Sequence, residues 1–219
     1  HQNIKLRADY FSAKEVGGDF YDYFKIDETH VGVVIADVSG KGVGAALFMT
    51  ISKTVLKNQL QLGISPAAAI TNANRQLCEN NDAGLFVTCW AGVYDTETNV
   101  ITFVNAGHNP PVLLKNGEKA TFVKQKSGFV LAGLDGFQYT QQEIQLSVGD
   151  ELFFYTDGVT EATDEKDKLY GEERLLECLN KCRDLDVSEQ LKAVKEDIDT
   201  FVDGWEQFDD ITIMVMKIS

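Results

Sequence analysis

VGVVIADVSGKGVGAALFM, residues 31 to 49, is the stretch on which the fold of this chain depends. Its first part, Val31 to Ala36, is apolar and rich in β-branched residues, which predicts a buried strand. The strand ends at Asp37, and a Gly-rich turn then leads into a helix that begins near Ala45. A carboxylate at the end of a buried strand, beside glycines that let the backbone approach a ligand, is placed to hold a cation. Asp is also common in plain turns, so this stretch alone leaves a simple turn as the alternative.

Composition is that of one globular domain covering residues 1–219. Of the 219 residues, 44% are hydrophobic and 25% are charged, which is enough for an ordinary core. The formal net charge is −14, with 20 Lys and Arg against 34 Asp and Glu. Such an acidic surface argues against nucleic acid as a partner, because phosphate backbones need basic surfaces. It does not exclude a phosphorylated substrate, provided that bound cations supply positive charge.

The cysteines and the hydropathy pattern predict a cytoplasmic protein. Cys78, Cys89, Cys178 and Cys182 show no zinc-ligand spacing, so we expect reduced packing thiols and a reducing compartment. No apolar run is long enough to span a bilayer and no signal peptide is visible, so we expect no membrane contact by this domain. The sequence begins with His1 rather than Met, and we therefore expect it to be excised from a longer regulatory protein. An upstream sensory or receiver domain would then lie outside this sequence.

Hydrophobic periodicity predicts strands that are mostly joined by short links, with two pairs of helices. The expected strands are Ile4–Ala8, Asp19–Phe24, Val31–Ala36, Phe86–Tyr94, Val100–Val104, Val112–Leu114, Gln138–Leu146, Glu151–Thr156 and Ile211–Val215. The expected helices are Ala45–Leu60, with its apolar residues at Leu47, Ile51 and Val55, then Pro66–Glu79, Glu172–Lys181 and Ser188–Val202. Short links favour antiparallel pairing, and helices in consecutive pairs favour an α+β fold.

Carboxylates recur at the ends of these strands. They are Asp19, Asp37, Asp157, and Asp209 or Asp210. Because the end of one antiparallel strand lies beside the start of its neighbour, we expect these acids to meet at one rim of the sheets. Clustered carboxylates repel one another unless cations hold them, and hard oxygen ligands favour Mg²⁺ or Mn²⁺ over zinc or copper. The alternative is that each acid serves locally, in a turn or as an edge charge.

Five motifs, in one order and nearly from end to end of the chain, carry a family resemblance. They are EVGGDFYD (15–22), ADVSGKGVGAAL (36–47), NAGHNPP (105–111), YTDGVTEA (155–162) and DDITIMV (209–215). Together they resemble the SpoIIE/RsbU-like branch of the metal-dependent PPM (protein phosphatase 2C-like) serine/threonine phosphatases. The resemblance implies a four-layer α-β-β-α sandwich with two central, mainly antiparallel sheets flanked by helix pairs.

The resemblance also implies a site with two Mn²⁺ or Mg²⁺ ions. Asp37 would bridge both ions, the carbonyl of Val38 would join one coordination sphere, and Asp19 would bind one ion. Asp157 and Asp209 would bind the other ion, with Asp19, Asp37 and Asp157 counted as catalytic. Further candidates are Asp210, which is adjacent to the implied ligand, and Glu161, where relatives place an acid near a weak third metal.

The implied reaction is attack of a metal-bound hydroxide on phosphoserine or phosphothreonine, without a phosphoenzyme. The implied substrate is a phosphorylated anti-sigma-factor antagonist or a similar partner-switching protein, and a homodimer is compatible with this branch. Two residues depart from the eukaryotic pattern: Lys14 is the only basic residue just before Gly17, where relatives have Arg, and Ser39 replaces a His proposed as general acid. His108 is an alternative proton donor, although a His in a Gly-Asn-Pro turn commonly holds its loop by hydrogen bonds.

Two other functions compete with an active protein phosphatase. One is a catalytically silent regulatory module of the same fold that binds a phosphoprotein. The other is a metal-dependent phosphohydrolase acting on a small molecule, which would need a deep enclosed pocket. Loss of a metal ligand would favour the silent module, and all the implied ligand positions carry suitable residues.

Overall fold

The computed structural model describes residues 3–79 and 81–219, which form two compact units. Unit 1 comprises residues 3–15, Pro110–Val123 and Ser147–Ser219, and unit 2 comprises Val16–Asn109, apart from residue 80, and Lys124–Leu146. Each unit holds one five-stranded sheet. Because unit 1 is assembled from three segments, its sheet depends on pairing between residues that are far apart in sequence.

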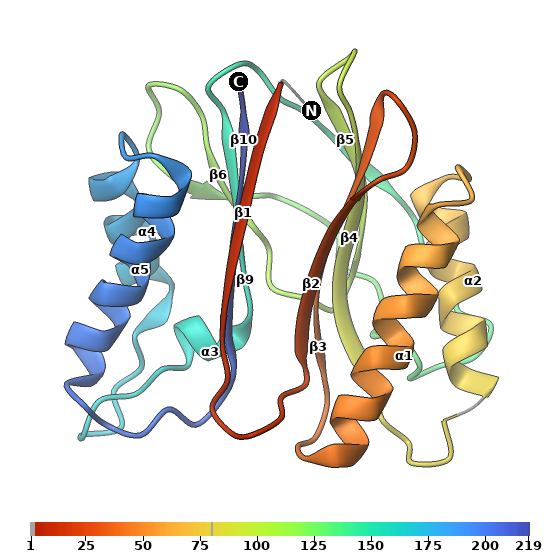
Figure 1. The fold of residues 1–219 in the computed structure, drawn as a ribbon, viewed down its shortest axis with the longest axis horizontal. Helices are drawn as coiled ribbons and strands as arrows, with labels where there is room; N and C mark the ends of the chain where they lie inside the picture. Colours follow the sequence, from red (N-terminus) through yellow and green to blue (C-terminus); the bar gives the residue numbers. More distant parts are fainter. Residues whose placement is uncertain (1–2, 80) are drawn as a thin grey trace. The chain divides into compact units, whose positions relative to one another are not determined.

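Unit 2 contains the stretch 31–49. Its strands are β2 (Asp19–Lys25), β3 (His30–Val38), β4 (Val87–Asp95), β5 (Val100–Ala106) and β8 (Gln142–Gln145), and its helices are α1 (Val43–Leu60) and α2 (Pro66–Glu79). The strand order is β2-β3-β4-β5-β8, with every neighbouring pair antiparallel. Helices α1 and α2 run side by side along this sheet (Figure 1). Buried residues such as Val34, Leu56 and Ile70 form the core where the helices meet the sheet.

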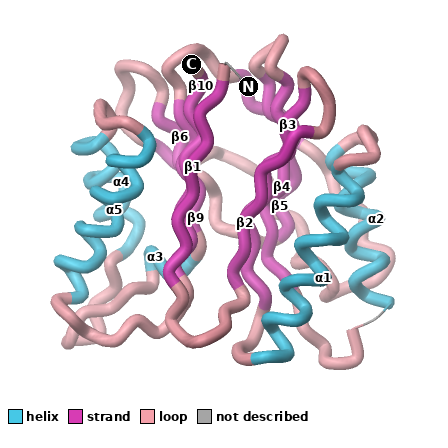
Figure 2. Tube along the Cα trace, viewed as in Figure 1, coloured by secondary structure: helices cyan, strands magenta, loops and turns pink. Residues whose placement is uncertain are grey.

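Unit 1 has the same plan. Its strands are β1 (Ile4–Phe11), β6 (Val112–Leu114), β7 (Thr121–Phe122), β9 (Glu151–Tyr155) and β10 (Ile211–Ile218), and its helices are α3 (Asp157–Thr160), α4 (Gly171–Cys182) and α5 (Val187–Val202). The order is β1-β10-β9-β6-β7, again antiparallel throughout. Figure 2 shows the helices α4 and α5 (cyan) along the strands of this sheet (magenta). Phe153, Leu191 and Val215 belong to the core of this unit.

Helix boundaries follow the local sequence. Gly63, with a φ of 68°, lies just after α1, in a backbone region that glycine enters without steric cost. Ser65 then caps α2, because its hydroxyl accepts a hydrogen bond from the backbone N–H of Ala68 at 3.3 Å. At the start of α5, Asp186 and Glu189 form a reciprocal capping box. These signals explain why the predicted and observed ends of α2 and α5 agree within a residue.

The prediction for the buried face of α1 is wrong. Leu47 and Ile51 are 62% and 51% exposed, and only Val55 of the predicted stripe packs against the core. The buried residues of α1 are Ala45, Phe48, Ser52, Leu56 and Leu60. Both sets repeat at helical spacing, so periodicity alone did not distinguish the face that contacts the sheet from the opposite one.

Smaller differences concern short elements. The predicted strand 138–146 is reduced to β8, while β7 and α3 were not predicted. These elements have two to four residues, too few to show a periodic pattern. The predicted fold class, α+β with two antiparallel sheets and helix pairs, is confirmed, with each unit supplying one sheet and one pair. That residues 1–219 act as one domain stays a prediction. In the described ranges, no helix combines the length and apolar content needed to cross a bilayer.

Candidate active site

The first carboxylate pair lies in unit 2, at the adjoining ends of β2 and β3. Asp19 begins β2 and Asp37 is the penultimate residue of β3, and the two are direct partners in the antiparallel register. Asp19 is buried, with 4% of its surface exposed, and Asp37 is half-buried. Directly opposed residues on antiparallel strands point to the same face, where like charges repel. A cation bound between them would remove this repulsion. Such a cation is what the sequence analysis predicts for these carboxylates.

Gly18 lets the backbone of Val38 approach closely beside this pair. A Cβ at Gly18 would lie 2.8 Å from the carbonyl oxygen of Val38 and 3.5 Å from Oδ1 of Asp37. Both oxygens therefore border the space that a side chain at position 18 would fill. The backbone there is fixed, because the N–H of Val38 donates to the carbonyl of Gly18 at 3.2 Å. Carboxylate and carbonyl oxygens that lie close together fit the hard-ligand chemistry of Mg²⁺ and Mn²⁺.

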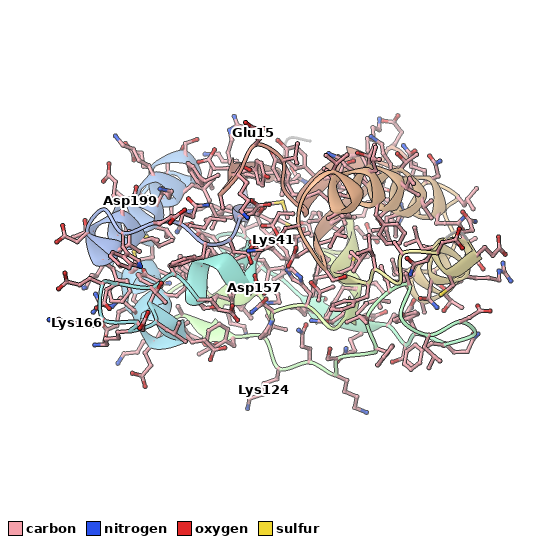
Figure 3. The ribbon with its side chains drawn as sticks, turned by 90° about the horizontal axis from the view of Figure 1, so that it is seen from below. Glu15, Lys41, Lys124, Asp157, Lys166 and Asp199 are labelled. Carbon is pink, nitrogen blue, oxygen red and sulfur yellow. The ribbon has the colours of Figure 1, made fainter. Side chains whose placement is uncertain are left out.

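The second group of carboxylates lies in unit 1, where β9 ends beside the start of β10. Thr156 fixes this junction: its N–H donates to the carbonyl of Thr212 at 3.1 Å, and its hydroxyl accepts from the N–H of Thr212 at 3.0 Å. Asp157 follows as the first residue of α3 and is half-buried; Figure 3 shows it beside the α3 ribbon. A Cβ at Gly158 would lie 2.0 Å from the carbonyl oxygen of Asp210, so these two backbones are in contact. The structure thus brings Asp157 close to the 209–210 segment.

Asp209 and Asp210 differ in how their carboxylates are used. Asp210 is 5% exposed, and its carboxylate accepts hydrogen bonds from the N–H of Ala13 at 2.9 Å, Tyr10 Oη at 3.2 Å and Ser12 Oγ at 3.4 Å. Asp209 is half-buried, and its Oδ1 accepts from the N–H of Asp210 at 2.9 Å. The Asp210 carboxylate therefore holds the end of β1 and the segment after it.

The additional candidates have different surroundings. Glu161 is exposed at the end of α3, where its N–H donates to the carbonyl of Asp157 at 2.8 Å. His108 is 6% exposed, with its Nδ1 3.0 Å from the hydroxyl of Thr88. Its backbone N–H and carbonyl both bond to the side chain of Asn105 at 2.8 Å. The two hydrogen bonds to Asn105 show that His108 stabilises the loop in which it lies.

The two positions that depart from the eukaryotic pattern are also engaged locally. Ser39 is joined to Phe86 by two bonds of 2.8 Å: its hydroxyl accepts from the N–H of Phe86, and its own N–H donates to the carbonyl of Phe86. Lys14 is exposed, and its carbonyl accepts a bond from the hydroxyl of Ser12 at 2.5 Å. The Ser39 hydroxyl thus helps to fix the turn after β3, by linking it to the backbone of Phe86.

Each unit carries its own acids, and that all of them meet at one rim stays a prediction. Across residues 3–79 and 81–219, the structure shows no group of three or more His, Cys, Asp or Glu side chains arranged to hold a metal. It shows one acidic pair in unit 2 and one acidic group in unit 1. Sequence reasoning overlooked the residues around Asp209, in particular Trp205 and Glu206. Their signal was an aromatic residue beside acids in the segment DGWEQFDD (203–210).

Comparison with known proteins identifies the family. The sequence model of the family described as Stage II sporulation protein E (SpoIIE) matches residues 27–219. The phosphoserine phosphatase RsbU of Bacillus subtilis is 33% identical over 153 residues, which are 70% of this chain and 45% of that protein. The chain spans less than half the length of the curated relatives first matched, at 38% and 45%.

Two solved structures share the fold. The PP2C phosphatase domain of SpoIIE from Bacillus subtilis, solved with a fragment of its regulatory domain, matches with a TM-score of 0.86 and 21% identity over 99% of this chain and 63% of that one. The catalytic domain of the serine/threonine phosphatase PstP, in complex with 2 manganese ions, matches with a TM-score of 0.71 and 15% identity over 99% and 98% of the two chains. The family match covers most of the chain and includes four of the five motifs, all except EVGGDFYD (15–22). The chain therefore belongs to the SpoIIE family, the RsbU-type branch of the PPM phosphatases.

Proposed function

We propose that this chain is a metal-dependent protein phosphatase that hydrolyses phosphoserine or phosphothreonine. The observation that carries the proposal is the pairing of Asp19 with Asp37 at the adjoining ends of β2 and β3, with the carbonyl oxygen of Val38 close to Gly18 beside them. The second acidic group, at Asp157 and Asp209, supports it. Further support comes from the family and from RsbU, which is named a phosphoserine phosphatase.

The residues present fit two divalent cations. In the proposed assignment, Asp19, Asp37 and the carbonyl of Val38 would hold one ion, and Asp157 and Asp209 would hold the other. When bound, Mn²⁺ or Mg²⁺ lowers the pKa of a water and neutralises charge on the phosphoryl oxygens. A chain with a net charge of −14 needs such neutralisation to accept a phosphate ester.

The chain's own residues position these groups. Antiparallel pairing fixes the separation of the backbones that carry Asp19 and Asp37, and the bonds of Thr156 to Thr212 fix the start of α3 that carries Asp157. The Ser39 hydroxyl is engaged by the N–H of Phe86, and His108 is engaged by Asn105 and Thr88, so we assign neither of them as the general acid.

We propose a phosphorylated partner-switching protein of the anti-sigma-factor antagonist type as the substrate, and the cytoplasm as the location. The support is family membership and the similarity to RsbU. A protein substrate, unlike a small phosphate ester, has side chains on either side of its phosphoserine. Recognition of these side chains can be tested at the protein surface next to Asp209.

The proposal is tested by hydrolysis of p-nitrophenyl phosphate while Mn²⁺ is titrated in. We expect turnover that depends on Mn²⁺ and falls by about 100-fold or more, equivalent to about 2.7 kcal/mol in the barrier, in Asp37→Asn and Asp157→Asn. Each variant has a matched control in its own unit, Asp82→Asn and Asp184→Asn respectively, both at exposed positions. The controls should keep the parent rate.

Two results would contradict the proposal. Calorimetric Mn²⁺ binding without turnover of this ester or of phosphoserine peptides would identify a silent phosphoprotein-binding module. Absence of both turnover and Mn²⁺ binding would show that the carboxylates are not metal ligands.

A further inference from the structure

A cavity of about 330 Å³ in unit 1 lies next to the proposed ligand Asp209. Its walls come from α3, from the C-terminal end of α5 and from the segment that leads into β10. Asp209 and Gly158 are among its lining residues. The cavity therefore adjoins Asp209 and the residue that follows Asp157 in the chain.

The lining combines an apolar floor with an acidic rim. Ile198, Val202 and Ile211 contribute the apolar side chains. The carboxylates of Glu161, Asp199, Glu206 and Asp209 also line the cavity, whereas no Lys or Arg is among the described residues that do so. One of these acids is already neutralised, because Lys195 bonds to Asp199 at 2.5 Å. Glu161 and Glu206 contribute further negative charge at the cavity.

An aromatic ring is held at this cavity by a well-fixed segment. The helix α5 ends at Asp203, which has a φ of 48°, and the N–H of Trp205 then donates to the carbonyl of Val202 at 2.9 Å. Gln207 Nε2 donates to the carbonyls of Phe11 and Asp209, both at 2.8 Å. Trp205 remains 46% exposed. Exposing half of an indole ring forgoes hydrophobic stabilisation, and a fixed, exposed aromatic residue at a cavity is a common feature of binding sites.

We infer that this cavity is a specificity subsite for an arginine or lysine side chain that flanks the phosphoserine of the protein substrate. A long basic side chain has an apolar stem that suits Ile198 and Val202, and a cationic head that suits the Glu206 carboxylate and the Trp205 ring. Asp209 lines the cavity and is also a proposed metal ligand, so the bound side chain lies close in sequence to the phosphorylated residue. The inference rests on the proposed phosphatase function, and its test separates the two.

The kinetic test compares phosphoserine peptides that differ only by Arg or Gln at one position on either side of the phosphoserine. The parent protein should prefer Arg at one position, and Glu206→Gln and Trp205→Leu should each lower kcat/KM for the Arg peptide by about three- to fivefold. In both variants the ratio of kcat/KM for the Arg peptide to that for the Gln peptide should fall towards one, because a Gln side chain has no charge for the cavity to bind. Glu177→Gln, an exposed change on α4 in the same unit, is the matched control and should behave as the parent.

Charge reversal gives a sharper result. Glu206→Lys should reverse the preference, so that a peptide with Glu at that position is hydrolysed faster than the Arg peptide. A variant that had only loosened the segment would lose activity on all peptides alike.

A binding test decides the inference even if the chain shows no turnover. The protein has two tryptophans, and Trp90 is fully buried, so fluorescence changes on ligand binding at the cavity should come from Trp205. An Arg peptide carrying a non-hydrolysable phosphonate in place of the phosphate ester should change this fluorescence more than its Gln counterpart, and Trp205→Leu should remove the change.

Equal responses to both peptides, or equal kcat/KM values at every position, would overturn the inference and leave the phosphatase proposal standing. A change in Trp205 fluorescence with Mn²⁺ alone, and none with the Arg peptide, would overturn it in favour of a metal site. Binding of the Arg peptide without any hydrolysis would support the subsite and contradict the phosphatase.

Discussion

At the scale of single residues, Asp209 and Asp210 show how two adjacent carboxylates take different roles. Asp210 is buried and accepts hydrogen bonds from a backbone N–H and two hydroxyls around the end of β1. Asp209 is half-buried and lines a cavity. From the sequence alone, only the family motif ranked Asp209 above Asp210 as a candidate metal ligand, because the two residues have the same chemistry.

This difference predicts different effects of two alanine substitutions. Asp210→Ala removes the acceptor of Ala13, Tyr10 and Ser12, and should lower the free energy of unfolding by about 1–3 kcal/mol in metal-free buffer. Asp209→Ala removes the acceptor of one backbone N–H, so it should lower metal-free stability by less than Asp210→Ala does, and it should weaken Mn²⁺ binding. Urea unfolding in the presence of a chelator measures the first effect, and calorimetry the second. If Asp210→Ala were stable and lost Mn²⁺ binding, the two roles would have to be exchanged.

At the scale of the elements, α1 presents two apolar faces. One face, with Phe48, Leu56 and Leu60, packs on the sheet of unit 2, and the other, with Leu47 and Ile51, is more than half exposed. A hydrophobic repeat indicates that a helix has an apolar face. When a helix has two such faces, packing against the sheet determines which of them is buried.

Paired substitutions on α1 test which face stabilises the fold. Leu56 is fully buried, so Leu56→Ala should lower the free energy of unfolding by about 2–5 kcal/mol. Leu47→Ala removes the same atoms from a residue that is 62% exposed and should cost less than about 0.5 kcal/mol. Denaturant unfolding of both variants gives the comparison. Equal losses would mean that the exposed face is covered in solution.

At the scale of the whole molecule, the excess of acidic over basic residues is the property with the widest effect. A net charge of −14 makes the folded chain repel itself, and acidic groups at Asp19 and Asp37 and at Asp157 and Asp209 add local repulsion. Monovalent salt screens both kinds of repulsion, whereas divalent ions that bind specifically stabilise only the folded state.

We therefore expect Mn²⁺ to raise the Tm more than NaCl does at equal ionic strength. The excess should correspond to about 2.7 kcal/mol when Mn²⁺ is present at about 100 times its dissociation constant. Asp37→Asn should remove the excess but keep the effect of NaCl, and Asp82→Asn should keep both. Differential scanning calorimetry in matched buffers provides the measurement, and an equal response to the two salts would argue against specific metal binding.

The sequence by itself determined the strands, most helix ends and the positions of the acids, because these depend on local features. Alternating and β-branched runs set β1, β3, β4 and β10, capping residues set α2 and α5, and each acid follows or precedes a strand in the chain. The five motifs also carried the family, which the comparisons confirm.

Only the tertiary structure decided which residues meet. The register that opposes Asp19 to Asp37, and the pairing of β1 with β10 across nearly the whole chain, depend on contacts that no local pattern contains. The buried face of α1, the hydrogen bonds that engage Asp210 and the cavity beside Trp205 have the same origin. Burial and hydrogen bonding are properties of surfaces brought together from distant segments, and these surfaces exist only once the chain has folded.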